Sequence, residues 1–267
     1  MRKLLIAVVA LAAAIAVASV AYAANVYTVN GSAPAKGKGS KTKPVPTSVK
    51  LSFQVTETDP GQRGTVVQKY ALGSEGLVAN PKLFPKCAFS NLDDEPLVPS
   101  KCAKALVGTG IAKNAAGASN DRSLANSAGC NLGVRLYNTG SGLAIRLDAA
   151  QRNVAIDSNE IGCALPIHTA INAKFVKHKI GGLTASDLVF TVPATPLRHP
   201  LPGIDNSIRR SDSNVKLKVR KVNGKRRGFY EKIGCKGGSR LVRGQFTTEA
   251  TASAPSVKIT KTKNGKC

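Results

Sequence analysis

Aromatic and acidic residues are scarce in this chain of 267 residues. It contains no tryptophan, five tyrosines and seven phenylalanines, and only 15 aspartates and glutamates against 39 lysines and arginines. Surfaces that stack sugars or bases usually need exposed aromatic rings, so this composition argues against such a surface and predicts an aliphatic core. The formal net charge of +24 favours polyanions as partners.

Recognisable catalytic and metal-binding motifs are missing as well. The chain has no G-x-S-x-G segment and no closely spaced pair of cysteines, and His168, His178 and His199 fall in no metal-ligand spacing. The acidic residues 93–95 lack the spaced oxygen ligands of a calcium loop and are interpreted as a solvated turn. No dedicated nucleic-acid recognition motif is visible. We therefore predict a protein that is not an enzyme and holds no metal or cofactor.

A secreted hydrolase acting on envelope polysaccharide is the alternative function. Asp148, Asp157 and Glu160 could supply a pair of catalytic carboxylates, but such a pair needs a cleft that the sequence does not reveal. Cys163 and His168 could form a nucleophile and its base. In an exported protein, however, Cys163 is expected in a disulfide, which removes the reactive thiolate.

The first 23 residues have the layout of a secretory signal peptide. Arg2 and Lys3 precede an apolar run over residues 4–18, and residues 21–23 (Ala-Tyr-Ala) place small side chains at a cleavage site. An uncleaved anchor helix is the alternative, because the apolar stretch approaches the ~20 residues that span a bilayer. The cleavage site and the polar sequence after it favour removal. We expect a secreted or cell-envelope-associated protein with no transmembrane helix after cleavage.

Six cysteines in a protein expected outside the cytoplasm predict disulfide bonds. Six cysteines allow about 15 pairings, of which pairing between sequence neighbours is the simplest. Each closed loop of this kind would stabilise the fold by roughly 3 to 4 kcal/mol. The cysteines are Cys87, Cys102, Cys130, Cys163, Cys235 and Cys267.

Alternation of polar and apolar residues predicts antiparallel strands along much of the chain. Residues 24–48 are predicted to form a flexible basic tether, because most of them are glycine, serine, proline, lysine or other small residues. Residues 49–267 are predicted to form one all-β domain, an antiparallel β-sandwich of immunoglobulin-like or jelly-roll-like type. The alternation lies at residues 49–56, 134–136, 143–147, 167–175, 188–192, 215–220, 241–248 and 257–262.

Two segments break this pattern. Residues 112–129 are small and polar, and they are predicted to form a long loop. Residues 193–203 contain four prolines and are predicted to form a stiff, extended crossover between sheets. The P-x-x-P spacing at Pro193 and Pro196 leaves docking to an aromatic groove as the alternative.

Positive charge is concentrated in residues 209–227, where Asp212 is the only carboxylate. The alternation over residues 215–220 predicts a strand with its cations on one solvent-facing side, and Asn223-Gly224 suits a type I′ hairpin turn. Such a hairpin would attract an anionic cell-wall polymer or an acidic polysaccharide by counterion release. The alternative is that excess lysine serves solubility and protects edge strands. The predicted polyanion-binding residues are Lys216, Lys218, Arg220, Lys225, Arg226 and Arg227.

Four segments give the chain a resemblance to a known group of sequences. They are F-P-K-C at residues 84–87, C-A-K-A-L-V-G-T-G at residues 102–110, a Pro-rich strand exit at residues 188–203, and a C…G-Q-F-T…C module at residues 235–267. With these segments the chain resembles uncharacterised exported β-rich proteins of high-GC Gram-positive bacteria.

This resemblance implies two disulfide pairings but no catalytic residue. It implies that Cys87 pairs with Cys102, and that the last two cysteines pair with each other. Cys130 and Cys163 have no counterpart in the resemblance, so their connectivity stays open. No activity and no site residue are implied.

Overall fold

The computed structural model describes residues 25–93, 99–235, 238–250 and 255–266. The expected signal peptide, acidic residues 94 and 95, and Cys267 lie outside these ranges. Among the described residues, no helix has the length and apolar character needed to cross a membrane. The described chain is built mainly of antiparallel strands, which confirms the all-β prediction.

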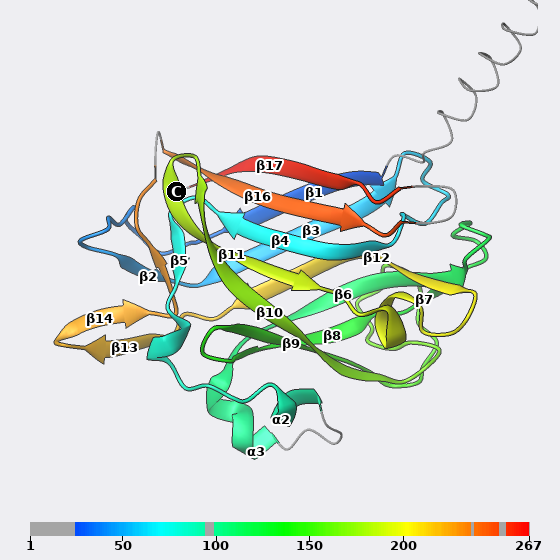
Figure 1. Ribbon diagram of the computed structural model, residues 1–267, viewed down its shortest axis with the longest axis horizontal. Coiled ribbons are helices and arrows are strands. Elements are labelled where there is room, and N and C mark those ends of the chain that lie inside the picture. The colour runs from blue at the N-terminus through cyan, green and yellow to red at the C-terminus, as the bar shows by residue number, and fades with distance from the viewer. Residues whose placement is uncertain (1–24, 94–98, 236–237, 251–254, 267) are drawn as a thin grey trace, which may run out of the picture.

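Most of the strands belong to one continuous sheet of 12 strands (Figure 1). Neighbouring strands in this sheet run antiparallel. The spatial order is β1 (Asn25–Ser32), β3 (Val49–Glu57), β12 (Ile204–Val215), β6 (Leu106–Ala118), β8 (Leu132–Asn138), β9 (Gly142–Ala149), β10 (Ile167–Ile180), β11 (Leu183–Thr191), β4 (Val67–Ser74), β16 (Ser239–Thr248) and β17 (Lys258–Lys266), with β7 (Ala128–Gly129) paired to β6.

The sheet curls until its two end strands meet. β1 and β17 lie against each other, and a Cβ atom added to Gly265 would be 3.1 Å from the carbonyl oxygen of Gly31. The result is a nearly closed, barrel-like sheet, so the predicted division into a two-sheet sandwich is corrected. Twist accumulates from strand to strand, and over this many strands it carries one edge of the sheet round to the other.

The beginning of the predicted tether is part of the barrel. β1 pairs with β3 along its full length. Tyr27 and Val29 face the interior and are 4 % and 2 % exposed, which gives β1 a buried side like that of any other strand in the sheet. The irregular part of the predicted tether is the loop over residues 33–44, which carries four exposed lysines and leads into β2 (Val45–Thr47).

Apolar side chains fill the barrel, and smaller elements lie at its two ends. A three-stranded sheet of β2, β15 (Tyr230–Lys232) and β5 (Leu77–Ala79) lies at one end. At the other end the Pro-rich segment of residues 193–203 connects β11 to β12, which belong to the same sheet, so the predicted crossover between two sheets is corrected (Figure 1). This segment is not extended throughout, because it forms a helical turn, η3 (Ala194–Arg198), whose Leu197 is buried in the core.

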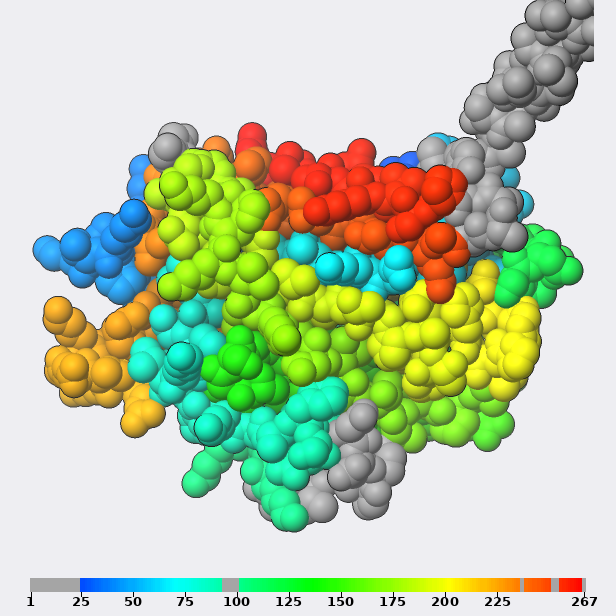
Figure 2. Space-filling view, in the orientation of Figure 1, coloured from blue at the N-terminus to red at the C-terminus, as the bar shows by residue number. Residues whose placement is uncertain are grey.

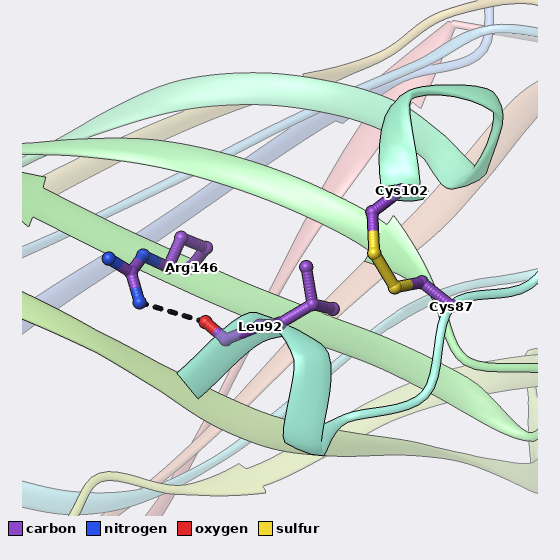
Figure 3. The surroundings of a disulfide bond; sticks show 4 residues. All are labelled: Cys87, Leu92, Cys102 and Arg146. Carbon is purple, nitrogen blue, oxygen red and sulfur yellow. Dashed lines mark hydrogen bonds between the residues drawn. A yellow bond between two sulfur atoms is a disulfide. The ribbon is translucent and has the colours of Figure 1, made fainter. Parts of the chain in front are cut away.

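A short helical excursion between β5 and β6 covers part of the outer face. It consists of η1 (Pro81–Leu83), α2 (Ser90–Asp93), α3 (Pro99–Cys102) and η2 (Ala103–Ala105). The Cys87–Cys102 disulfide holds α3 close to the chain before α2, and Nη1 of Arg146 in β9 donates to the Leu92 carbonyl oxygen at 2.8 Å (Figure 3). This cover explains why consecutive residues of β9 are buried on both of its faces.

The disulfides join cysteines that are neighbours in the sequence. Cys87 is bonded to Cys102, and Cys130 is bonded to Cys163. The second bond resolves the pairing that the sequence left open. Cys235 is also disulfide-bonded, and the expected partner in the last position of the chain lies outside the described residues.

Replacing Cys130 and Cys163 together by alanine should lower the free energy of unfolding. The two residues are 33 positions apart, and the chain-entropy relation for a loop of this size gives a loss of roughly 3 to 4 kcal/mol. Urea unfolding of the variant beside the native protein measures the difference. A loss below about 1 kcal/mol would show that the bond does not stabilise the barrel by restricting the unfolded chain.

Candidate anion-binding site

A two-stranded hairpin projects from the end of the barrel that carries β2, β15 and β5 (Figure 1). β13 (Val219–Val222) pairs with β14 (Lys225–Gly228). The connecting residues Asn223 and Gly224 have φ angles of 49° and 74°. Positive φ at both central positions is the requirement of a type I′ turn, so the predicted turn is confirmed.

The strand leading into the hairpin is shorter than predicted. β12 ends at Val215 and β13 begins at Val219, so the predicted continuous strand over residues 215–220 is wrong. Leu217 is 52 % exposed and Val219 is 36 % exposed, because the chain leaves the barrel here and no second layer covers these side chains. Lys216 and Lys218 therefore lie in a connecting segment and do not share a strand face with Arg220.

Like charges stand directly opposite each other across the hairpin. Arg220 is paired in register with Arg227, and Lys221 is paired with Arg226. Directly opposed residues lie on the same face of an antiparallel pair, and like charges in that position are destabilising. Successive residues alternate between faces, so both faces of the hairpin carry positive charge.

Arg227 has a structural partner and is not a free cation. Its Nε and Nη2 donate to the Glu231 carboxylate at 2.9 and 3.0 Å. The Glu231 side chain is 1 % exposed. Burial raises the pKa of Glu231, but hydrogen bonds from Arg227, the Gly228 amide and Asn80 outweigh it and hold the pKa below its ordinary value. Arg227 therefore compensates a buried carboxylate at the base of the hairpin.

Arg220 and Lys218 attach the hairpin to the helical excursion. Arg220 Nη1 donates to the Leu83 carbonyl oxygen at 2.8 Å, and Lys218 Nζ donates to the Lys104 carbonyl oxygen at 3.4 Å. Burial lowers the pKa of Lys218, and the neighbouring charge of Lys216 lowers it further. These two contacts hold the side chains of Arg220 and Lys218 against the helical excursion.

The remaining cations of the hairpin are exposed. Within the described part of the chain, Lys216, Lys221, Lys225 and Arg226 form no ion pair and are largely open to solvent. Lys221 was not among the predicted binding residues. Lys221 could have been identified from the predicted two-residue turn, because a turn centred on residues 223 and 224 places Lys221 opposite Arg226.

The lysine-rich loop before β2 lies beside the hairpin. β2 packs on β14, and a Cβ atom added to Gly228 would be 2.7 Å from Cβ of Pro46. In the space-filling view the loop (blue) and the hairpin (orange) protrude from the same end of the molecule (Figure 2). The loop adds four exposed lysines, which are Lys36, Lys38, Lys41 and Lys43.

A surface hollow of about 510 Å³ lies at the base of the hairpin. Lys82, Lys86 and Arg220 line it together with Thr139 and Ser141, and none of its lining residues is acidic. Cations and hydroxyl groups of this kind are suited to an anionic group. We call the hairpin, the loop of residues 33–44 and this hollow the basic end of the barrel.

Carboxylates are nearly absent from the basic end. In residues 33–47, 77–86, 139–141 and 216–232, Glu231 is the only acidic residue, and Arg227 already neutralises it.

No family model, curated protein or solved structure matches this chain. The function is therefore inferred from the residues of the basic end alone.

The carboxylates considered for catalysis are engaged elsewhere in ion pairs. Asp148 contacts Arg146 at 3.0 Å and His168 at 3.2 Å. Asp157 accepts hydrogen bonds from Arg209, and Glu160 pairs with Arg152. Cys163, considered as a nucleophile, is bonded to Cys130. Within the described residues, each of these groups therefore has a structural partner.

A second polar cluster surrounds η3. His199 lies between two carboxylates, with Nδ1 3.1 Å from Asp205 and Nε2 2.7 Å from Glu249, and Arg198 also pairs with Glu249. Burial raises the pKa of Glu249, but hydrogen bonds from Arg198 and His199 bring it below the ordinary value. Among the described residues, no group of histidine, cysteine and acidic side chains is arranged to hold a metal ion.

Proposed function

We propose that this protein is an exported, non-catalytic protein of the cell envelope that binds anionic polymers at the basic end of its barrel. The ligand class is a phosphate-bearing cell-wall polymer or an acidic polysaccharide. Disulfide bonds persist in oxidising compartments outside the cytoplasm, where such polymers occur, and this supports the expected export. The cations lie on three separate segments, which suits a polymer with repeated charges better than a single small anion.

The register of the hairpin is the observation that carries this proposal. Lys221 and Arg226 face each other as like charges and form no ion pair within the described residues, and Arg220 faces Arg227, whose charge Glu231 already compensates. A hairpin that needed only to be soluble could alternate charge sign across its strands and gain cross-strand attraction. The repulsion within this hairpin is relieved when a polyanion lies along it, because the ligand then supplies the missing negative charge and releases its counterions.

Retention of the mature protein on immobilised teichoic acid or heparin tests the proposal. Within the described residues, four cations in and just before the hairpin form no ion pair, and each phosphate neutralised contributes a slope of about −0.7 to −0.9 in log K against log salt. We therefore expect a slope of about −3 or steeper for the native protein. Immobilised dextran, which is uncharged, is the control and should not retain it. Binding that does not weaken with salt would contradict the proposal.

A further inference from the structure

Inside the barrel lies a largely apolar cavity of about 140 Å³, and none of the hairpin cations lines it. Side chains of β8, β9 and β10 line one wall, and side chains of β3, β4 and β11 line the other. The apolar lining includes Phe53, Leu72, Val134, Leu136, Ile145 and Leu188. An engineered cavity of about 150 Å³ with a similar lining binds benzene, so this space has the size of one small ring.

Polar side chains interrupt the apolar lining, among them several serines, Arg198, which pairs with Glu249, and two buried asparagines. Asn114 of β6 and Asn206 of β12 line the cavity and are 6 % and 5 % exposed. Asn206 Nδ2 donates to the Leu197 carbonyl oxygen at 2.8 Å. Within the described residues, neither Asn114 Oδ1 nor Asn206 Oδ1 has a hydrogen-bond partner.

The two asparagines lie on the same inward face of neighbouring strands. Asn114 is opposite Ile208, and Asn206 is opposite Ala116. Because opposed residues share a face and every second residue returns to it, both side chains belong to one patch of the interior wall. Ser74, which is 8 % exposed, also lines the cavity, and its Oγ has no partner in the described part of the chain.

Buried amide oxygens without a donor are unfavourable, and native proteins rarely contain them. A leucine at either position would fill the same space without this penalty, so the interior wall is less stable than an aliphatic wall of the same shape. A bound molecule that brings O–H or N–H donors to these oxygens removes the penalty, and its apolar body gains the contact with the surrounding aliphatic side chains.

We propose that the interior of the barrel binds a small, uncharged amphiphile of the phenol class. Its apolar ring occupies the cavity, and its hydroxyl donates to Asn114 or Asn206. This binding site is independent of the basic end, because none of the hairpin cations lines the cavity. Leu197, which lines the cavity and accepts the hydrogen bond from Asn206, places η3 beside the bound molecule.

Titration of the native protein with phenol and with benzene, followed by the NMR methyl signals of leucine, isoleucine and valine, tests this inference. Phenol should shift the signals of lining residues such as Leu136 and Ile145 in a saturable way. Benzene has the same ring without the donor, so its dissociation constant should be about tenfold higher. Equal affinity for the two probes, or shifts confined to residues outside the cavity, would overturn the proposal.

A pair of variants separates recognition by the asparagines from general apolar binding. Replacing Asn114→Leu and Asn206→Leu together should remove the preference for phenol, because both amide acceptors are lost while the serines of the lining stay. Asn172→Leu is the matched control, since Asn172 lies on β10 and is exposed on the outside of the barrel. It should keep the native preference. A preference for phenol that survives in the double variant would also overturn the proposal, and the native titration decides the matter if that variant does not fold.

Discussion

A variant that carries Lys221→Glu, Lys225→Glu and Arg226→Glu should elute from a teichoic-acid column at or below about 0.15 M salt, where the native protein is still retained. These side chains are exposed and form no ion pair within the described residues, so their reversal leaves the contacts of the fold intact. Loss of three cations should make the slope of log K against log salt shallower by about 2 to 3. Elution at graded salt concentrations measures both quantities.

The matched control reverses three exposed lysines on another part of the barrel. Lys258→Glu, Lys261→Glu and Lys263→Glu on β17 change the net charge by the same amount, and all three side chains are exposed. This control should keep most of the retention, because its cations lie away from the basic end. If both variants lose retention equally, net charge alone governs binding, and the solubility interpretation of the lysines replaces the proposed site.

Arg227 is left unchanged in this test for a structural reason. It pairs with the buried Glu231, so Arg227→Glu would place two carboxylates together at the base of the hairpin. Such a variant is expected to destabilise the fold, because removing one member of a largely buried pair leaves an uncompensated charge. Loss of binding in it would not distinguish a damaged site from a damaged barrel.

Strands with one buried face were predictable from the sequence. Alternation identified β3, β10 and the hairpin of β16 and β17, because these strands place apolar side chains inside and polar ones outside. The Asn223-Gly224 turn was also predictable, since few dipeptides tolerate positive φ at both positions. The neighbour pairing of Cys87 with Cys102 and of Cys130 with Cys163 was the simplest of the open alternatives.

β6 and β12 could not be predicted from the sequence, and the reason is physical. Residues 112–118 were expected in a loop, yet they complete β6, and β12 pairs with β6 along most of its length. Both strands carry alanine, glycine, serine and asparagine where they face the interior, so their hydrophobicity does not alternate. Ser211, Ser213 and Asn206 can face inward because this wall borders a cavity. The small and polar inward-facing residues, which make these two strands hard to predict, therefore also form the polar side of the proposed interior site.

The basic segment was predictable, but the roles of its residues were not. Composition located the charge, whereas the end of β12 at Val215 depends on where the chain leaves the barrel. The pairing of Arg227 with Glu231 depends on the position of β15 between β2 and β5. The end of β12 is set by long-range strand pairing, and the four-residue spacing of Arg227 and Glu231 does not by itself reveal that the carboxylate is buried.

The Asp187→Ala variant should lose about 3 to 5 kcal/mol of unfolding free energy, the range measured when one partner of a buried ion pair is removed. Asp187 of β11 pairs with Arg243 of β16, and their side chains are 4 % and 11 % exposed. β4 runs between these two strands and contributes Gly73, which lies opposite Arg243. A Cβ atom at Gly73 would be 1.9 Å from Asp187 Oδ1, so the glycine leaves the space in which the two charges meet.

Urea unfolding of Asp187→Ala and of a control, Asp212→Ala, measures the effect of burial. Asp212 pairs with Arg210, but its side chain is 37 % exposed, so the control should lose at most about 1 kcal/mol. Equal losses in the two variants would contradict the importance of the buried pair.

Replacing both Asp187→Leu and Arg243→Met should recover much of the stability lost in Asp187→Ala. The single replacement leaves the Arg243 guanidinium buried beside Gly73 without a counter-charge, whereas the double replacement removes both charges from the site. A double-mutant cycle that closes with the single variants Asp187→Leu and Arg243→Met gives the coupling energy directly. If the double variant is as unstable as the sum of the single variants, the loss comes from packing around β4 and not from the unpaired charge.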